Sequence, residues 1–292
     1  MADPLAQARH DIAVANRVVS HEGIIDAFGH VSMRHPTRPD RYLISRSRSP
    51  EVVEASDVYE YTLDSEPATP LPNGIRGYGE LVIHGEIYKA RPDVNAVAHH
   101  HNMSFLPFCN SGEELLPLYH MGAQIGEKVP FWDSRDEFGD TCLLVLKPEE
   151  GASLARALGK HSVVLMRRHG ATVVGASLRE LVFRAIYSCD NARYLSEAKQ
   201  LGNFSPLTPG EIEMAQAIYQ LPGAQSRAWE YWETRLAKRG GMPARRTQAA
   251  APRPSLPGLR GSVSKRAGLA AKTAAKKAVA RKPVTSKGGK RK

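Results

Sequence analysis

The chain has 292 residues, of which 42% are hydrophobic and 24% charged, enough apolar material for one large core or two small ones. No run of eighteen apolar residues occurs, which excludes a transmembrane helix, and residues 1–9 lack the apolar stretch that a secretory signal requires. The net charge of +10 is uneven: residues 245–292 hold fifteen of the forty Lys and Arg and no Asp or Glu, so residues 1–244 carry −5.

Residues 1–240 alternate between patterns typical of helices and of strands, so we expect one α/β domain there. The first helix is predicted at residues 4–22, where apolar side chains recur with a helical period. Further helices are predicted at residues 80–90, 148–158, 178–201, 209–220 and 225–238. Strands are predicted at residues 27–34, 41–45, 57–63, 94–101, 141–146, 162–167 and 171–174. With no internal repeat, this mix indicates helices packed over a central sheet.

Residues 245–292 form a basic, Ala- and Lys-rich tail without aromatic residues. Such a segment cannot bury enough apolar area to offset the entropy of ordering, so we expect it to be disordered. Its charge is compatible with weak, nonspecific binding to nucleic acid or an anionic surface. We favour the simpler interpretation, a solvated extension without catalytic importance.

The three cysteines, Cys109, Cys142 and Cys189, are odd in number and widely spaced. They form no CxxC pattern, which argues against a structural zinc site or a redox pair. We therefore interpret them as reduced thiols and expect a cytoplasmic protein.

The strand predicted at residues 94–101 reads VNAVAHHH. Side chains alternate between the two faces of a strand, so His99 and His101 point to one side and His100 to the other. A third histidine, His169, ends the strand predicted at 162–167, where Gly170 would let the chain turn away. Three imidazoles leave open positions on a metal ion, as a catalytic site needs. We predict one divalent ion here, without choosing among Mn, Zn, Fe and Co; the alternative is ordinary hydrogen-bonded histidines.

Glu80 begins the helix predicted directly before the histidine strand, and His84 follows one turn later on the same face. We interpret His84 as a packing residue or a hydrogen-bond partner of the metal ligands rather than as a ligand.

Taken together, these motifs resemble the class II aldolase/adducin family, which includes fuculose phosphate aldolase and ribulose phosphate 4-epimerase. The resemblance covers about residues 10–200. It is carried by Gly29-His30-Val31-Ser32-Met33-Arg34, Tyr42-Leu43-Ile44-Ser45, Glu80 with His84 and Tyr88, His99-His100-His101, and His169-Gly170. It implies a three-layer α/β/α fold with a largely antiparallel or mixed central sheet, and usually a homotetramer with active sites between subunits. It also implies that His99, His101 and His169, with Glu80, hold the metal and that Glu80 is the acid/base residue.

The chain departs from the sugar-phosphate aldolases at the positions that bind phosphate. Their serine pair before the glutamate is Tyr78-Gly79 here, their Gly-Asn pair is Gly29-His30, and their Thr-Gly pair is Ser47-Arg48. A phosphate needs several converging hydroxyl and backbone donors, so these replacements argue against a sugar phosphate substrate.

Gly-His-Val-Ser followed by Leu-Ile-Ser-Arg-Ser is instead similar to the decarboxylase branch, which acts on hydroxylated aromatic or pyridine carboxylates. We therefore predict a metal-dependent decarboxylase, in which the ion stabilises an enolate-like charge and Glu80 protonates the carbon that loses CO2. The predicted substrate contacts are His30, Arg46, Ser47 and Tyr78. Arg46, in preference to Arg48, would pair with the substrate carboxylate. The predicted walls of the pocket are Tyr78, Phe105, Phe108 and Trp132.

Three alternatives use the same residues differently. The first is an aldolase or epimerase acting on a sugar-like or sugar-phosphate substrate, and the second is a non-heme iron oxygenase, because three histidines also suit Fe(II). The third is an adducin-like binding protein, although adducin-like proteins lose the metal histidines that this chain keeps. If the protein is a tetramer, as the resemblance implies, Tyr231 on the last predicted helix is a candidate to cap a neighbouring subunit's active site; the alternative is simple packing.

Overall fold

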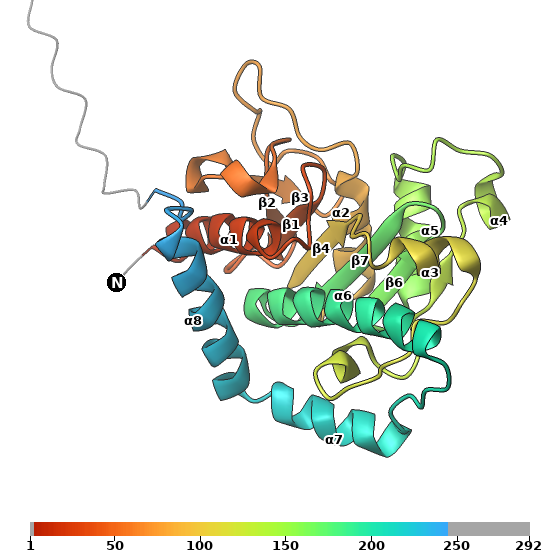
Figure 1. The fold of residues 1–292 in the computed structure, drawn as a ribbon. Coiled ribbons are helices and arrows are strands. Elements are labelled where there is room, and N and C mark those ends of the chain that lie inside the picture. Colours follow the sequence, from red (N-terminus) through yellow and green to blue (C-terminus); the bar gives the residue numbers. More distant parts are fainter. Residues whose placement is uncertain (1–2, 245–292) are drawn as a thin grey trace, which may run out of the picture. The chain divides into compact units, whose positions relative to one another are not determined.

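The computed structural model describes residues 3–244, drawn in Figure 1. The tail predicted at 245–292 lies outside the described residues. A seven-stranded sheet in the order β3-β2-β1-β4-β7-β6-β5 forms the centre, and all neighbouring strands are antiparallel except the parallel pair β5 and β6. The strands are β1 His30–Arg34, β2 Arg41–Ser45, β3 Val58–Thr62, β4 Ala96–His100, β5 Phe131–Trp132, β6 Val163–Met166 and β7 Gly170–Gly175.

Helices cover both faces of this sheet (Figure 1). Helices α1 and α6 lie on one face, with α8 packed against them, and α2 and α5 lie on the other. The helices are α1 Pro4–His21, α2 Leu81–Ala90, α3 Leu106–Ser111, α4 Arg135–Phe138, α5 Pro148–Leu158, α6 Leu178–Leu201, α7 Pro209–Tyr219 and α8 Pro222–Lys238. The predicted three-layer α/β/α fold with a mixed sheet is confirmed. Among residues 3–244, no helix has the length and apolar character needed to cross a bilayer.

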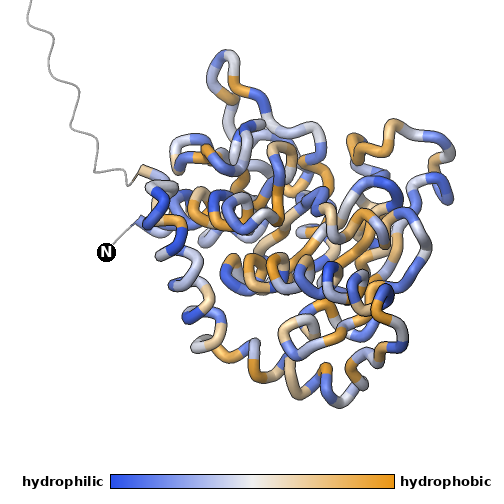
Figure 2. Tube along the Cα trace, viewed as in Figure 1, coloured by the Kyte–Doolittle hydropathy of each residue, from blue (hydrophilic) through white to orange (hydrophobic). Residues whose placement is uncertain are grey.

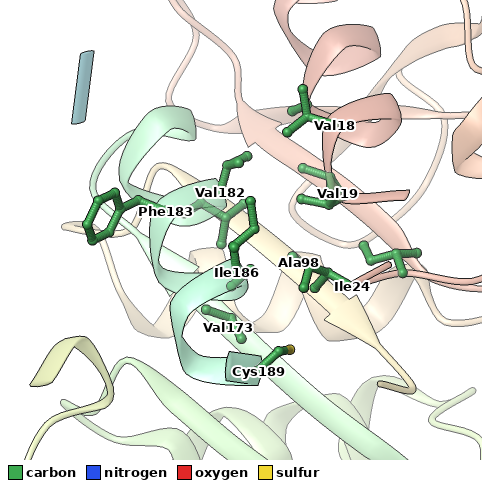
Figure 3. Packing of buried hydrophobic residues seen from close by; sticks show 14 of the residues in the cluster. Val18, Val19, Ile24, Ala98, Val173, Val182, Phe183, Ile186 and Cys189 are labelled. Atoms are coloured by element: carbon green, nitrogen blue, oxygen red, sulfur yellow. The ribbon is translucent and has the colours of Figure 1, made fainter. Parts of the chain in front are cut away.

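The alternation of side chains along each strand divides the buried residues into two cores. In Figure 3, Val19 of α1 and Val182 and Ile186 of α6 pack over Ala98 and Val173, which point from β4 and β7 to the same face. The next residues along these strands point to the opposite core, under α2 and α5. Figure 2 shows apolar and hydrophilic residues alternating along α1 and α6, as expected for helices with one buried side.

One predicted strand is wrong: residues 141–146 form an irregular loop. Leu143 adopts a left-handed conformation with φ 68°, which an extended strand does not allow. Leu144 and Leu146 are both 45% exposed, whereas Val145 between them is buried. The Val145 N–H donates to the carboxylate of Glu80, not to a neighbouring strand. The edge of the sheet is formed instead by β5, which is only two residues long and carries too short a pattern to predict.

Candidate metal centre and substrate pocket

Three histidines converge at one end of the central strands. His99 lies near the end of β4, His101 directly follows that strand, and His169 lies in the turn between β6 and β7. His101 Nε2 is 3.0 Å from His99 Nε2 and 3.1 Å from His169 Nε2. His100 points to the opposite core, where its ring lies 5.1 Å from that of Phe105. The three nitrogens thus meet where the sequence pattern places them.

The turn at His169 differs from the expectation in one detail. The residue with a left-handed backbone is Arg168, with φ 53°, and not Gly170. Gly170 is required for a different reason: a Cβ atom there would lie 2.2 Å from the carbonyl oxygen of His100. The glycine lets β7 approach β4 closely, and this close pairing holds His169 beside His99 and His101.

Glu80 directly precedes α2, and its buried carboxylate lies beside the histidines and makes no capping hydrogen bond to the helix. Its Oε2 lies 3.6 Å from His99 Nε2, and its Oε1 lies 3.6 Å from His169 Nε2. Oε1 also accepts a hydrogen bond of 2.9 Å from the Val145 N–H. Burial raises the pKa of Glu80 to about 7, although this hydrogen bond acts to lower it. Near neutral pH a large fraction of Glu80 can therefore carry a proton.

This set of side chains fits a divalent cation. Within the described residues, the group that could hold a metal ion is Glu80, His99, His101 and His169, whose ligand atoms all lie within 4.8 Å of one another. Burial lowers the pKa of His169 to about 4, that of His101 below its usual value and that of His99 well below it. The imidazoles are therefore neutral, the form that binds metals. Nitrogens about 2.1 Å from one ion lie roughly 3.0–3.4 Å apart, close to the spacing found here.

A cavity of about 300 Å³ opens beside Glu80. It is lined by Phe28, His30, Ser47, Tyr78, Gly79, Glu80, His101, Leu144 and Leu146. Three of the four predicted substrate contacts, His30, Ser47 and Tyr78, thus line the same cavity as Glu80 and His101. The Tyr78 ring packs 4.5 Å from the ring of His30, while its hydroxyl group donates to the carbonyl oxygen of Arg48 at 2.8 Å. Tyr78 therefore contributes a wall rather than a free hydroxyl group.

The prediction of the other walls is wrong. Phe105 and Phe108 are buried in the core on the α1 and α6 side, and Trp132 is buried on the other side, where its indole N–H donates to Ser153 Oγ at 2.9 Å. The apolar walls are Phe28, Leu144 and Leu146, which sequence reasoning missed. Their only signal is that they are large apolar residues. All three lie in segments predicted as strands, 27–34 and 141–146, but at positions that the structure places in loops.

The structure does not bring Arg46 to the cavity. Its Nε donates to Asp57 Oδ1 at 2.8 Å, and an Arg48 nitrogen donates to Asp57 Oδ2 at 2.5 Å. Asp57 also accepts a 2.9 Å hydrogen bond from the Glu54 N–H. The two arginines therefore brace the hairpin of β2 and β3 through one shared carboxylate.

Replacing Asp57 with alanine is expected to lower the free energy of unfolding by about 1–3 kcal/mol, because three donors lose their acceptor. Burial acts to raise the pKa of Asp57, but the hydrogen bonds from Glu54, Arg46 and Arg48 outweigh it and lower the pKa. The carboxylate therefore stabilises the fold above its unfolded pKa, and this contribution is lost as the pH falls through the lower, folded pKa. Urea unfolding at pH 7 and pH 3 should show a smaller difference between wild type and Asp57→Ala at pH 3. An equal difference at both pH values would contradict this role.

Comparison with known proteins places the chain in a family. The model of the class II aldolase and adducin N-terminal domain matches residues 10–195. Decarboxylase tropJ of Talaromyces stipitatus is 33% identical over 250 residues, which span 77% of this chain and 92% of that protein. A 3,4-dihydroxyphthalate decarboxylase of Arthrobacter keyseri is 32% identical over 194 residues, which span 62% of this chain and 74% of that protein.

A solved structure shares the fold. An aldolase II superfamily protein of Pseudomonas syringae superimposes with a TM-score of 0.70 at 22% identity, covering 83% of this chain and 96% of that one. The similarity to relatives named as decarboxylases agrees with the branch that the motifs indicate. From the domain match and the length of the shared sequence, this chain belongs to the class II aldolase and adducin family.

Proposed function

We propose that residues 1–240 form a divalent-metal-dependent lyase that removes CO2 from a hydroxylated aromatic or heteroaromatic carboxylate. The observation that carries this proposal is the position of Glu80: a buried carboxyl group of raised pKa beside three converging imidazoles, at the side of a largely apolar cavity. Two relatives named as decarboxylases support the reaction type, and the name of one specifies a dihydroxylated aromatic dicarboxylate.

In this proposal His99, His101 and His169 hold one ion, which is Mn, Zn, Fe or Co. When bound, the ion supplies a positive charge that draws electron density from a substrate hydroxyl oxygen. The protein keeps its three ligands neutral by burial, and it fixes the ring of His99 between β1 and β7, where its Nδ1 lies 3.4 Å from Thr172 Oγ1. Ligand orientation of this kind strengthens metal binding.

Glu80 performs the proton transfer. The bond between the ring carbon and the carboxylate carbon breaks, CO2 leaves, and the electron pair left on the ring carbon takes the proton of Glu80. The Val145 N–H occupies Oε1, so Oε2 is the oxygen that carries the proton. The carboxylate that remains takes a proton from solvent, and the site is restored.

The cavity suits a flat ring. Phe28, Leu144 and Leu146 provide apolar walls, and the ring of Tyr78, packed 4.5 Å from that of His30, adds to the lining. His30 and Ser47 supply polar groups to the same cavity. Apolar walls favour an uncharged ring and keep water from the reacting carbon.

The test is CO2 release by metal-loaded protein from benzene and pyridine carboxylates that carry an ortho hydroxyl group, with matched acids that lack it. We expect release only from the hydroxylated set. Formation of an aldehyde or an epimer from sugars or sugar phosphates would instead indicate the aldolase or epimerase alternative. Oxygen consumption with the hydroxylated acids would indicate the oxygenase. CO2 release from none of the acids would contradict the proposal.

Tyr231 remains the candidate for a contribution across subunits of a homotetramer. It is 54% exposed on α8, and its hydroxyl group accepts a 2.7 Å hydrogen bond from Arg235, whereas Trp229 and Trp232 are buried. If Tyr231 reaches a neighbouring active site, Tyr231→Phe should lower turnover and leave the metal content unchanged. Trp229, which packs within its own chain, is not expected to act in this way. Unchanged turnover of Tyr231→Phe would refute the contribution.

A further inference from the structure

A chain of buried polar side chains leads away from the cavity between β1 and α2. His30 Nδ1 lies 2.7 Å from His84 Nε2, His84 Nδ1 lies 2.6 Å from Ser32 Oγ, and Ser32 Oγ lies 2.8 Å from the Tyr88 hydroxyl oxygen. All four side chains are buried, with at most 1% exposed. We call these four residues the His30 network. Its cavity end is His30, and the other three residues are not among those that line the cavity.

The periodicities of two elements produce this network. Residues two apart on a strand share a face, which places His30 and Ser32 side by side on β1. Residues four apart on a helix share a face, which places His84 and Tyr88 opposite them on α2. Glu80 begins the same row of that helix. One helix face therefore supplies both the acid/base carboxyl group and the support of His30.

The protons of the network can be placed by counting donors and acceptors. Burial lowers the pKa of His84 to about 3 and raises the pKa of Tyr88, so the imidazole and the phenol are both neutral. If Tyr88 donates to Ser32, Ser32 donates to His84 Nδ1 and His84 Nε2–H donates to His30 Nδ1, each of these protons has an acceptor inside the network. In the opposite arrangement His30 donates to His84, His84 to Ser32 and Ser32 to Tyr88, and the Tyr88 proton then has no acceptor within the network. The first arrangement leaves His30 with its own proton on Nε2.

We propose that Tyr88, Ser32 and His84 hold His30 in the tautomer protonated on Nε2, so that this neutral imidazole presents a fixed hydrogen-bond donor to the substrate carboxylate. Nδ1 of His30 is occupied by His84, and Nε2 is the nitrogen left for a ligand in the cavity. His30 contacts the substrate, and the other three are positioning residues. The assignment of the carboxylate as the acceptor rests on the proposed decarboxylase function.

A neutral donor suits this reaction for an electrostatic reason. The carboxylate loses its negative charge as CO2 leaves. A full positive charge beside it would therefore stabilise the bound substrate more than the transition state, and this difference would slow the reaction. A neutral imidazole also orients the carboxylate, but it opposes the loss of CO2 less than a positively charged group would. Arg46 and Arg48 are both paired with Asp57, so neither places its positive charge beside His30.

Two measurements test the proposal. The first is the tautomer of His30 in metal-loaded, substrate-free protein, from ¹⁵N correlation spectra of histidine-labelled protein assigned with His30→Asn. Wild type should show His30 protonated on Nε2. In Ser32→Ala, which breaks the network, part of His30 should appear in the form protonated on Nδ1. In Tyr88→Phe, which keeps the ring but loses the hydroxyl group, the fraction of this form should be smaller. The control Ser188→Ala removes another buried serine hydroxyl, bonded to the Ala185 carbonyl oxygen in α6, and should leave the tautomer unchanged.

The second measurement is steady-state kinetics with the hydroxylated acid that is turned over. We expect KM to rise about tenfold in Ser32→Ala with less than a twofold change in kcat, because the donor orients the bound carboxylate. Wild type protonated on Nδ1, or equal spectra for Ser32→Ala and Ser188→Ala, would overturn the proposal. The spectra need no substrate. If no acid releases CO2 but the tautomer behaves as expected, the proposed function fails and the tautomer assignment stands.

Discussion

Replacing His99 with alanine is expected to remove the metal from the protein and to abolish CO2 release. His99 is fully buried, and its Nε2 lies 3.0 Å from His101 Nε2 and 3.6 Å from Glu80 Oε2. Loss of a residue that only supports a metal ligand already weakens metal binding about 10–100-fold, so loss of the ligand itself should cost more. Mass spectrometry of dialysed protein should find near one metal per wild-type chain and almost none in the variant.

A matched control separates loss of the ligand from loss of any histidine. His120 is exposed and contacts the rings of Tyr119 and Tyr219, away from the metal centre. His120→Ala should keep both its metal and its activity, and circular dichroism should show that all three proteins are folded. Metal retained in His99→Ala would refute the site. Wild type that takes up no metal after soaking with manganese, zinc and iron would remove the lyase mechanism and favour an adducin-like binding role.

The meeting of the three histidines of the candidate metal centre could be predicted because their arrangement is local. Alternation along one strand separates His99 from His100, and His169 lies in the turn that joins β6 to β7, the partner of β4. Helix boundaries were predictable for the same reason: Pro148 begins α5, and the side chain of Ser177 caps α6 by accepting from the Glu180 N–H.

The cavity walls could not be predicted, because they depend on where loops lie in the folded protein. Leu144 and Leu146 belong to an apolar run that resembles a strand, yet the left-handed Leu143 keeps it out of the sheet. Phe105 follows the histidines in sequence, but whether it faces the cavity or the core is decided by the packing of α3. In each case the sequence pattern identifies an apolar residue but does not show whether that residue lies in the core or lines the cavity.

Long-range polar pairing was also missed. Arg46 and Asp57 meet across the hairpin of β2 and β3, eleven residues apart, and the pattern of the loop carries no sign of this. His30 and His84 are 54 residues apart and meet only because α2 packs on β1. His84 was expected to pack or to support the metal ligands; it is fully buried, its ring stacks 6.2 Å from that of Tyr42, and its polar contacts are with His30 and Ser32. Once the pairing of β1 and α2 is known, the spacings in both elements explain the contact.

Replacing Glu80 with glutamine is expected to lower kcat by about 10²–10⁴-fold, the usual contribution of a positioned acid or base. The amide has the same shape, and its oxygen can still accept the Val145 N–H, but it has no proton to give to the ring carbon. Glu86→Gln is the matched control: it changes a carboxylate on the same helix whose partner is Lys89 and which does not line the cavity, so its rate should match wild type.

The metal content of Glu80→Gln separates two roles of this residue. The Glu80 oxygens lie 3.6 Å from the nearest histidine nitrogens, farther than the 3.0–3.1 Å between the imidazoles themselves. Three imidazoles should therefore retain near one metal per chain while turnover falls, and this combination would assign proton transfer to Glu80. Loss of the metal together with the rate would make Glu80 a metal ligand first, and another group would then have to deliver the proton. Full activity with full metal would exclude both roles, and the carbon that loses CO2 would then have to gain its proton from another group or from water.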